Sequence, residues 1–221
     1  KRQVAFISPI NFYKIENVVP EIYENGENPL ILVLDRITDV RNFGAICRTA
    51  ECAGINAILV PEQNAAAINS DAIKTSSGAL QHIKICRTWN MKLSLQFLKD
   101  SGLHILGCTE KAKNSIFSIN YTCPLAIVVG SEEDGISSEL LKICDNKVKI
   151  PMKGKISSLN VSVAASALLF EALRQRQVAN IIPESGEGMS QETYKEKIFE
   201  WAYPDVAKSV SYTHLRAHET S

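Results

Sequence analysis

The sequence predicts an α/β fold: a mostly parallel sheet flanked by helices. Short β-like runs alternate with helical patterns through the middle of the chain, and such alternation is typical of a parallel sheet covered by helices. The runs at 30–34 and 125–129 are continuously apolar, as expected for strands that are buried on both faces. Gly54 and Gly102 follow helical stretches, where glycine commonly ends a helix.

The predicted elements follow one another from residue 30 onward. The predicted strands cover residues 30–34, 57–60, 83–86, 104–108, 125–129 and 147–150. The predicted helices cover residues 43–53, 91–99, 137–144 and 161–175. We expect these elements to form one domain over residues 29–177.

The two ends of the chain do not share this pattern. Residues 1–28 contain Pro9, Pro20 and Asn25-Gly26, which are loop signals, so we interpret them as a lead-in or linker. Residues 178–208 form a polar extension to which we assign no role. Residues 209–221 resemble the read-through of a sequencing adapter. We interpret them as a non-native tail and exclude them from functional reasoning.

Composition narrows the class of protein. Hydrophobic residues make up 45% and charged residues 22% of the 221 residues, which excludes a disordered chain. The 24 basic and 24 acidic residues cancel. This argues against a uniformly basic nucleic-acid coat and leaves a local basic patch open. No apolar run approaches the ~18 residues that span a membrane. Six cysteines without C-x-x-C spacing indicate reduced thiols of a cytoplasmic protein.

Three segments that each follow a predicted strand are rich in functional side chains. Ligands of open α/β sheets bind at these carboxyl ends. The first segment carries Arg36, Arg41, Asn42 and Arg48. Asn42 is placed to cap a helix that begins at residue 43, and the three arginines form a positive patch suited to phosphate. Ion pairing with nearby acidic residues is an equally weighted alternative.

The second segment follows the strand at 125–129 and reads Gly130-Ser131-Glu132-Glu133-Asp134-Gly135-Ile136. A glycine directly after a buried strand lets a ligand approach the backbone closely. The three acids at 132–134 repel phosphate and favour hydroxyls, amines or a sulfonium. The structural alternative is an acidic turn that caps the helix starting near residue 137.

The third segment runs from Ile150 through a Pro/Gly loop into the helix at 161–175. Ser157, Ser158 and Asn160 gather where that helix starts, so hydroxyls and exposed backbone N–H groups meet there. Ordinary N-capping explains one of these polar residues but not all three.

Several common site motifs are absent. No G-x-G-x-x-G follows a strand, and no P-loop, H-E-x-x-H or G-x-S-x-G occurs, which argues against a dinucleotide-dependent dehydrogenase. No cluster of metal ligands is present in the sequence, so we expect no metal.

Taken together, the three segments resemble the three signature motifs of the SpoU/TrmH branch of the SPOUT RNA 2′-O-methyltransferases. The matching stretches are NFGAICRTA at 42–50, GSEEDGI at 130–136, and IPM at 150–152 with SLNVS at 158–162. They occur in this order, and the resemblance extends from about residue 29 to residue 176. Within the branch the chain is most similar to the 23S rRNA guanosine-2′-O-methyltransferases.

The resemblance implies a fold and a reaction. It implies a C-terminal trefoil knot, a homodimer with sites near the subunit interface, and S-adenosylmethionine as cofactor without a metal. The reaction is methylation of a ribose 2′-OH in RNA, with a guanosine of 23S rRNA as the expected target. The alternatives are a tRNA 2′-O-methyltransferase and a catalytically silent module that binds cofactor or RNA. The 23S rRNA group carries an N-terminal RNA-binding domain, which we expect to be missing here.

The resemblance also assigns roles to individual residues. Arg48 is the catalytic arginine. We expect it to stabilise and orient, because a guanidinium stays protonated. The other catalytic candidates are Asn42, Glu132, Ser158 and Asn160. The cofactor-binding candidates are Gly130, Ile150 and Leu159, with Met152 and Thr109 as further candidates. Arg41 and Arg36 are the candidates for RNA binding.

Overall fold

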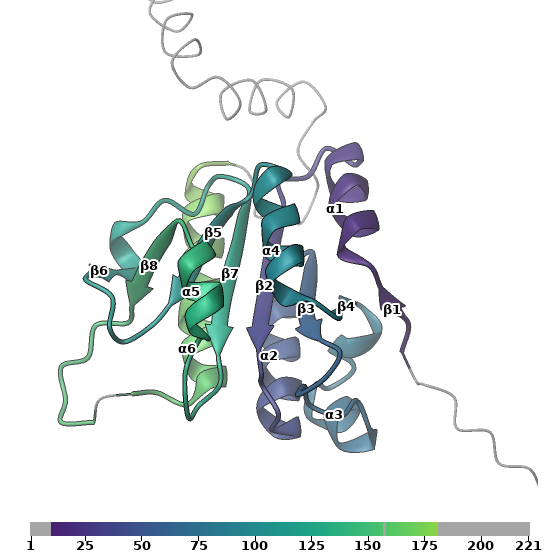
Figure 1. Cartoon of the computed structure of the whole chain (residues 1–221), viewed down its shortest axis with the longest axis horizontal. Coiled ribbons are helices and arrows are strands. Elements are labelled where there is room, and N and C mark those ends of the chain that lie inside the picture. Colours follow the sequence, from purple (N-terminus) through teal and green to yellow (C-terminus); the bar gives the residue numbers. More distant parts are fainter. Residues whose placement is uncertain (1–9, 157, 181–221) are drawn as a thin grey trace, which may run out of the picture.

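A computed structural model describes residues 10–156 and 158–180. Its strands are β1 (Phe12–Tyr13), β2 (Leu30–Asp35), β3 (Ala57–Pro61), β4 (Lys84–Thr88), β5 (His104–Cys108), β6 (Asn114–Ser115), β7 (Leu125–Gly130) and β8 (Asn146–Lys149). They form one sheet in the order β1-β4-β3-β2-β7-β5-β8-β6. Every neighbouring pair is parallel, so the carboxyl ends of the strands share one edge of the sheet (Figure 1).

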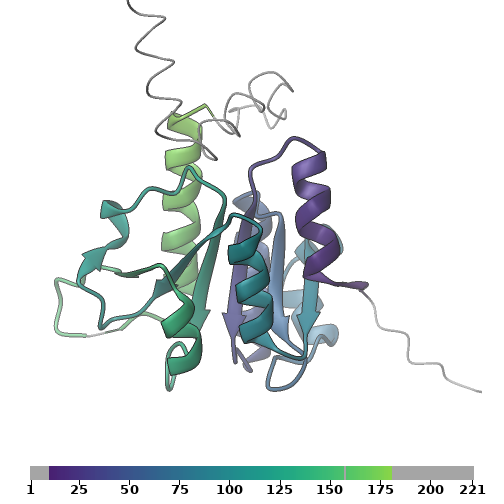
Figure 2. The same cartoon turned by 45° about the horizontal axis from the view of Figure 1, so that its top comes forward.

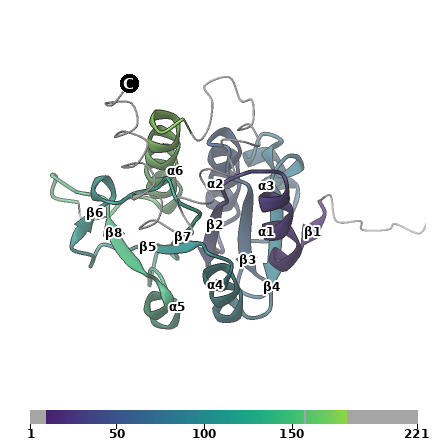
Figure 3. The same cartoon turned by 90° about the horizontal axis from the view of Figure 1, so that it is seen from above.

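Helices cover both faces of this sheet. They are α1 (Ile15–Glu24), α2 (Val40–Cys52), α3 (Ser70–Thr75), α4 (Met91–Asp100), α5 (Ser138–Ile143) and α6 (Val161–Val178). Helices α1, α4 and α5 pack on one face, whereas α2, α3 and α6 pack on the other (Figures 2 and 3).

The central strand β2 shows why two helical layers form. Leu30, Leu32 and Leu34 belong to the core that α2 and α6 share. Ile31 and Val33 belong to the core that α1, α4 and α5 share, because successive side chains of a strand point to opposite faces. All residues of β2 are buried, and so is nearly all of β7. This confirms the burial predicted for these two strands.

The predicted α/β class and parallel sheet are confirmed. Each predicted strand and helix overlaps an observed one, with bounds that differ by a few residues. Gly54 and Gly102 have φ angles of 70° and 87° directly after the last turns of α2 and α4. The N–H of Ile55 then bonds back to the carbonyl of Ala50, as in a Schellman motif.

The structure differs from the sequence interpretation on the N-terminal side. Residues 12–24, which the loop signals assign to a lead-in, form β1 and α1. β1 pairs with β4, and α1 buries Ile15, Val18, Val19 and Ile22 in the core. These positions have helical spacing, and Pro20 lies on the exposed side of the helix. The lead-in interpretation is therefore wrong for these residues, because their apolar spacing outweighs the proline.

The predicted C-terminal boundaries are only partly open to comparison. α6 ends at Val178, close to the domain limit predicted at 177. Most of the polar extension, and all of the segment 209–221, lie outside the described residues. The trefoil knot stays a prediction from the resemblance.

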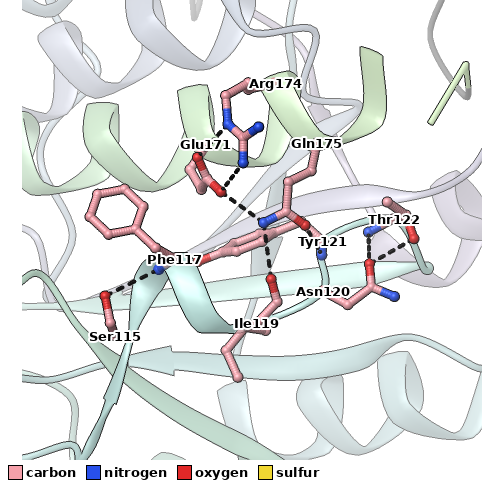
Figure 4. Close-up of polar contacts among 9 residues, drawn as sticks. All are labelled: Ser115, Phe117, Ile119, Asn120, Tyr121, Thr122, Glu171, Arg174 and Gln175. Atoms are coloured by element: carbon pink, nitrogen blue, oxygen red, sulfur yellow. Dashed lines mark hydrogen bonds and ion pairs between the residues drawn. The ribbon is translucent and has the colours of Figure 1, made fainter. Parts of the chain in front are cut away.

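A polar network holds the C-terminal half of α6 against the segment before β7 (Figure 4). Gln175 Nε2 donates to the carbonyl of Ile119 and to Glu171, and its Oε1 accepts the backbone N–H of Tyr121. Arg174 donates two hydrogen bonds of 2.8 and 2.9 Å to the buried carboxylate of Glu171, and these bonds lower the pKa of Glu171.

Arg176 is a second anchor of α6. Its side chain is 1% exposed and donates to the backbone carbonyls of Asn28, Pro29, Tyr121 and Cys123 at 2.8–3.0 Å. Burial lowers its pKa to about 10, so the guanidinium is still charged at neutral pH. These bonds tie the C-terminal end of α6 to the chain segments that enter β2 and β7.

Candidate functional site

Three side chains, one from each of the three segments, meet at the carboxyl edge of the sheet. Asn42 lies in the first turn of α2, Glu132 in the loop after β7, and Asn160 at the N-cap of α6. Asn42 Nδ2 donates to Glu132 Oε1 at 2.6 Å. Asn160 Nδ2 donates to Glu132 Oε1 and to Asn42 Oδ1 at 3.0 Å each. We refer to these three residues as the amide–carboxylate cluster.

The backbone N–H of Ser162, which can only donate, determines which way the side-chain amides of Asn160 and Asn42 are turned. The backbone N–H of Ser162 binds Asn160 Oδ1 at 2.9 Å, so Asn160 Nδ2 must face the cluster. That nitrogen donates to Asn42 Oδ1, which turns Asn42 Nδ2 toward Glu132. Glu132 Oε2 and one N–H of Asn42 therefore have no partner among the described residues and are open to a ligand.

The start of α2 explains why Asn42 is free to join the cluster. The prediction that Asn42 caps a helix beginning at residue 43 is wrong, because α2 begins at Val40 and Asp39 is its N-cap. Asp39 Oδ1 accepts the backbone N–H of Asn42 at 2.7 Å. Aspartate caps a helix about as well as asparagine, and Asn42 is left inside the first turn with its side chain directed at Glu132.

The acidic loop after β7 is fastened to the end of β2. Asp35 is buried, and its Oδ2 accepts the backbone N–H of Ser137, the N-cap of α5, at 2.6 Å. Arg36, which has a φ of 60°, donates to Asp35, Asp134 and the carbonyl of Gly135 at 3.1–3.2 Å. These contacts are the kind of ion pairing that the sequence left open as the alternative for the arginines, and RNA binding by Arg36 stays a prediction.

Gly130 has a role that differs from the one expected. The sequence predicts a glycine that lets a ligand approach the backbone. A Cβ on Gly130 would instead lie 2.0 Å from the carbonyl carbon of Gly135 and 2.1 Å from the nitrogen of Ile136. The loop closes there with a 2.9 Å bond from the Gly135 N–H to the Ser131 carbonyl. Gly130 is thus required by the loop itself, and a contact with cofactor stays a prediction.

The other cofactor candidates lie at or beyond neighbouring strand ends. Thr109 follows β5 and Ile150 follows β8, and β7, β5 and β8 are adjacent in the sheet. Ile150 packs partly buried against the core. Met152 and Leu159, in the segment from β8 to α6, are 38% and 39% exposed. At this edge, the carboxyl ends of three adjacent strands therefore lie beside partly exposed apolar side chains.

The structure does not bring Arg48 to the cluster. Arg48 and Arg41 are exposed on α2, and neither has a hydrogen bond or ion pair within the part of the chain that the structure describes. Arg48 lies six residues beyond Asn42, which is ~9 Å along a helix axis. Ser158 is also exposed and makes no described polar contact. Ser157 lies outside the described residues.

Three supporting residues of the site were not predicted in these roles: Asp35, Asp39 and Ser162. Asp39 carries a usable signal, because an aspartate directly before an amphipathic stretch is a capping residue. Asp35 ends an apolar strand, and its burial depends on the later return of the acidic loop. Ser162 donates both its backbone N–H and its hydroxyl to Asn160 Oδ1, at 2.9 and 2.6 Å; it lies in the quoted stretch at 158–162, but its partner could not be identified from the sequence.

Other kinds of site find less support in the structure. Within residues 10–156 and 158–180, no group of three or more His, Cys, Asp or Glu side chains is arranged to hold a metal ion. Over the same ranges, no helix has the length and apolarity to cross a membrane. Cys47, inside the first segment, is fully buried, and burial raises its pKa, so its thiolate is not available as a nucleophile.

Comparison with protein families gives two matches. The family model described as SpoU rRNA Methylase family matches residues 29–170. A second, described as SpoU, rRNA methylase, C-terminal, matches residues 174–215. The second match runs through the polar extension and includes residues 209–215 of the segment that we interpret as a non-native tail.

The sequence of a curated relative agrees with the family match. The 23S rRNA (guanosine-2′-O-)-methyltransferase RlmB of Photobacterium profundum is 42% identical over 163 residues, which are 74% of this chain and 66% of the relative. This chain thus spans slightly less than two thirds of that relative's length.

Several solved structures share the fold, and two of them represent the range of lengths that match. The SpoU methyltransferase AviRb from Streptomyces viridochromogenes in complex with the cofactor AdoMet is 30% identical, with a TM-score of 0.64 over 68% of this chain and 58% of that one. The A. aeolicus TrmH/SpoU tRNA modifying enzyme is 31% identical, with a TM-score of 0.66 over 86% of this chain and 98% of that one. Because the family model matches residues 29–170 and the fold is shared, the chain belongs to the SpoU rRNA Methylase family.

Proposed function

We propose that the chain transfers a methyl group from S-adenosylmethionine to a ribose 2′-hydroxyl of RNA, and that the target is a guanosine of 23S rRNA. The observation that carries the proposal is the amide–carboxylate cluster, because it joins one residue from each signature segment. The RlmB relative supports the guanosine target. An rRNA substrate in turn implies a cytoplasmic location.

The residues at the strand ends fit this cofactor. S-adenosylmethionine is a sulfonium cation with an adenine ring, and it supplies an electrophilic methyl group. The carboxylates at 132–134 follow β7, one of three adjacent strand ends, and suit the cationic sulfur. Ile150, Met152 and Leu159 are partly exposed apolar side chains that suit the adenine ring. Gly130 and Thr109 would add backbone contacts.

The chain's own residues would orient the ribose. Glu132 Oε2 is an open acceptor and Asn42 has an open N–H donor, a pairing that matches a hydroxyl group, which both donates and accepts. Asn160 holds these two groups in place through its bonds to both. Ser158, two residues before Asn160, would add a hydroxyl at the same helix terminus.

Arg48 is the candidate for stabilising charge on the ribose oxygen. An exposed guanidinium with no described intramolecular partner is free to bind a phosphate or a developing alkoxide. Arg41 lies seven residues earlier on the same face of α2, because seven residues are close to two helical turns. It is the candidate for binding a phosphate of the RNA.

Methyl transfer to unmodified RNA tests the proposal. The chain is incubated with S-adenosylmethionine carrying a tritiated methyl group and with 23S rRNA transcribed in vitro. We expect label on one guanosine ribose, identified by mass spectrometry and by resistance of that linkage to alkaline cleavage. The Glu132→Gln variant should bind cofactor more weakly in calorimetry and should still lose most transfer when cofactor is saturating. Label on a base, or cofactor binding without transfer by the wild type, contradicts the proposal.

One observation favours a tRNA substrate as the second candidate. The A. aeolicus tRNA modifying enzyme aligns with 86% of this chain over 98% of its own length, so it has nearly the same extent as this chain. The same assay with total tRNA beside 23S rRNA separates the two. Faster labelling of tRNA, with the label on one ribose, would favour this second candidate over rRNA.

We further propose that the chain works as a homodimer through α6. Val163, Ala167 and Phe170 lie on one stripe of α6, and Val163 and Phe170 are 51% and 49% exposed. An exposed apolar stripe fits the self-complementary contact of a two-fold dimer. α2 packs beside α6 through the 3.2 Å contact of Thr49 Oγ1 with Ser166 Oγ, which places Arg48 near this interface.

Light scattering at micromolar concentration tests the dimer. The wild type should have twice the mass of the chain, and Phe170→Glu should be a folded monomer. Leu93→Glu, at a residue of α4 that is 65% exposed on the other face of the sheet, is the matched control and should stay dimeric. A monomeric wild type contradicts the proposal.

A further inference from the structure

A cavity opens at the same edge of the sheet as the cluster, over β3 and β4. Residues 61–64 at the end of β3, Thr88 and Trp89 at the end of β4, and Arg36 after β2 line it. Its volume is about 300 Å³, at the lower end of the range for small-molecule sites. The space suits one flat ring rather than a complete nucleotide cofactor.

Trp89 is the most unusual residue of this cavity. Its side chain is 77% exposed, although tryptophan is on average a highly buried residue. Thr88, its neighbour, is tied down by hydrogen bonds from Ser94 Oγ and from the N–H of Asn90. The indole is therefore presented from a fixed strand end with a face open to solvent.

The cavity is also lined by polar side chains that are free to bind. Glu62, Gln63 and Asn64 are exposed, and their side chains make no hydrogen bond within the described residues. The backbone of the same segment is held, because the Glu62 N–H bonds to the Thr88 carbonyl at 2.9 Å. An aromatic surface and a small set of donors and acceptors thus line the same cavity.

Arg36 connects this cavity to the amide–carboxylate cluster. It lines the cavity and donates to Asp134 and Gly135 in the loop that carries Glu132. β4, β3, β2 and β7 are consecutive in the sheet, and neighbouring strands are ~4.8 Å apart. The cavity and the cluster are therefore within roughly 10–15 Å of each other along one edge, a distance that one strand of RNA can bridge.

We propose that this cavity binds an unpaired base of the RNA substrate that flanks the methylated nucleotide, with the base stacked on Trp89. The proposal rests on the proposed function and names a subsite of it. Single-stranded RNA is recognised by stacking its bases on aromatic side chains and by hydrogen bonds to their edges. Glu62 accepts only, so it favours a base edge that presents N–H groups, whereas Gln63 and Asn64 can donate as well as accept.

Fluorescence of Trp89 measures this contact directly. The chain has two tryptophans, Trp89 and Trp201, so a Trp201→Phe variant leaves Trp89 as the single reporter. The probes are nine-nucleotide single-stranded RNAs of A, U or C, a G-containing nonamer, and an RNA duplex. We expect saturable quenching by single strands and little by the duplex.

Substitutions test whether the indole contributes to affinity. Trp89→Ala should raise the Kd for fluorescein-labelled single strands by about 5- to 150-fold, the range found for loss of one stacked base. Trp89→Phe should recover most of that affinity. Glu62→Gln should weaken the preference for bases with N–H groups on their edge. Leu93→Ala, which removes an exposed apolar side chain of α4, is the control and should leave Kd unchanged.

The outcomes separate this subsite from the proposed reaction. Trp89→Ala should raise the KM for RNA in the methylation assay and leave kcat unchanged. An unchanged Kd for Trp89→Ala overturns the subsite even where the wild type methylates RNA. The subsite is also overturned if Trp89→Ala changes the oligomeric state and not the Kd, because Trp89 would then be a contact between copies of the chain. Quenching by RNA without any methyl transfer leaves the subsite standing and removes the proposed function.

Discussion

Asn160 Nδ2 donates to Asn42 Oδ1 at 3.0 Å, and this bond joins two residues that are 118 positions apart. It connects the first turn of α2 with the N-cap of α6, so the two helices begin at one place. Asn160 has two functions there, because its Oδ1 caps α6 through Ser162 while its Nδ2 holds the cluster. The two functions belong to different atoms of one side chain and can be separated by substitution.

We predict that Asn160→Asp keeps the fold but loses the site. Aspartate caps a helix as well as asparagine does, so the free energy of unfolding should stay within about 1 kcal/mol of the wild type. The Nδ2 donor is replaced by a carboxylate oxygen facing Glu132, so methyl transfer should fall by about tenfold or more. Denaturant unfolding and single-turnover methylation measure the two effects.

Two further variants control this prediction. Asn160→Ala should lose about 1 kcal/mol of stability together with the activity, because the cap is also removed. Asn69→Asp changes the N-cap of α3, which has no described contact with the cluster, and should leave transfer unchanged. Full activity in Asn160→Asp would show that the cluster does not act in the reaction.

We predict that Gly130→Ala destabilises the protein by about 3 kcal/mol or more. The new Cβ would meet backbone atoms of Gly135 and Ile136 at 2.0–2.2 Å, and backbone cannot move aside as a flexible side chain can. Gly154→Ala is the matched control, because a Cβ there meets nothing within 4 Å. Its stability should stay within about 0.5 kcal/mol. Equal midpoints for both variants in urea would mean that the loop opens freely.

We predict that Arg176→Met destabilises the protein by about 3 kcal/mol, because four backbone carbonyls lose their donor inside the core. The loss should lower the urea midpoint and also the affinity for cofactor, since α6 is no longer anchored. Arg41→Met is the control, because Arg41 is exposed and has no described partner, and it should change stability by less than about 0.5 kcal/mol. A small effect of Arg176→Met would mean that water replaces the guanidinium.

The fold was largely predictable because its determinants are local. Buried strands such as 30–34 and 125–129 are apolar without interruption, and residues after parallel strands must share one edge. Asn42, Glu132 and Asn160 each follow such a strand, so they could be expected to lie near one another at the carboxyl edge of the sheet. The lead-in interpretation failed where loop signals, among them Pro20, were weighted above the helical spacing of Ile15, Val18, Val19 and Ile22.

The details of the site depend on long-range contacts that no local pattern contains. The role of Gly130 depends on where residues 135 and 136 return, and the burial of Asp35 depends on Ser137. Helix geometry alone could have predicted where Arg48 lies relative to Asn42. Six residues are about one and two thirds turns, so Arg48 leaves α2 on a different side from Asn42.

The last prediction concerns Arg48. Arg48→Ala should lower single-turnover methyl transfer by about a hundredfold, or ~3 kcal/mol, because a charged donor to the developing alkoxide is lost. Stability and cofactor affinity should not change, since Arg48 is exposed and has no described partner. Arg48→Lys should not recover the rate, because an ammonium lacks the planar donor fork. Lys92→Ala, an exposed cation on α4, is the control. A near wild-type rate for Arg48→Ala at saturating cofactor and RNA would remove Arg48 from the reaction and leave it as a surface charge.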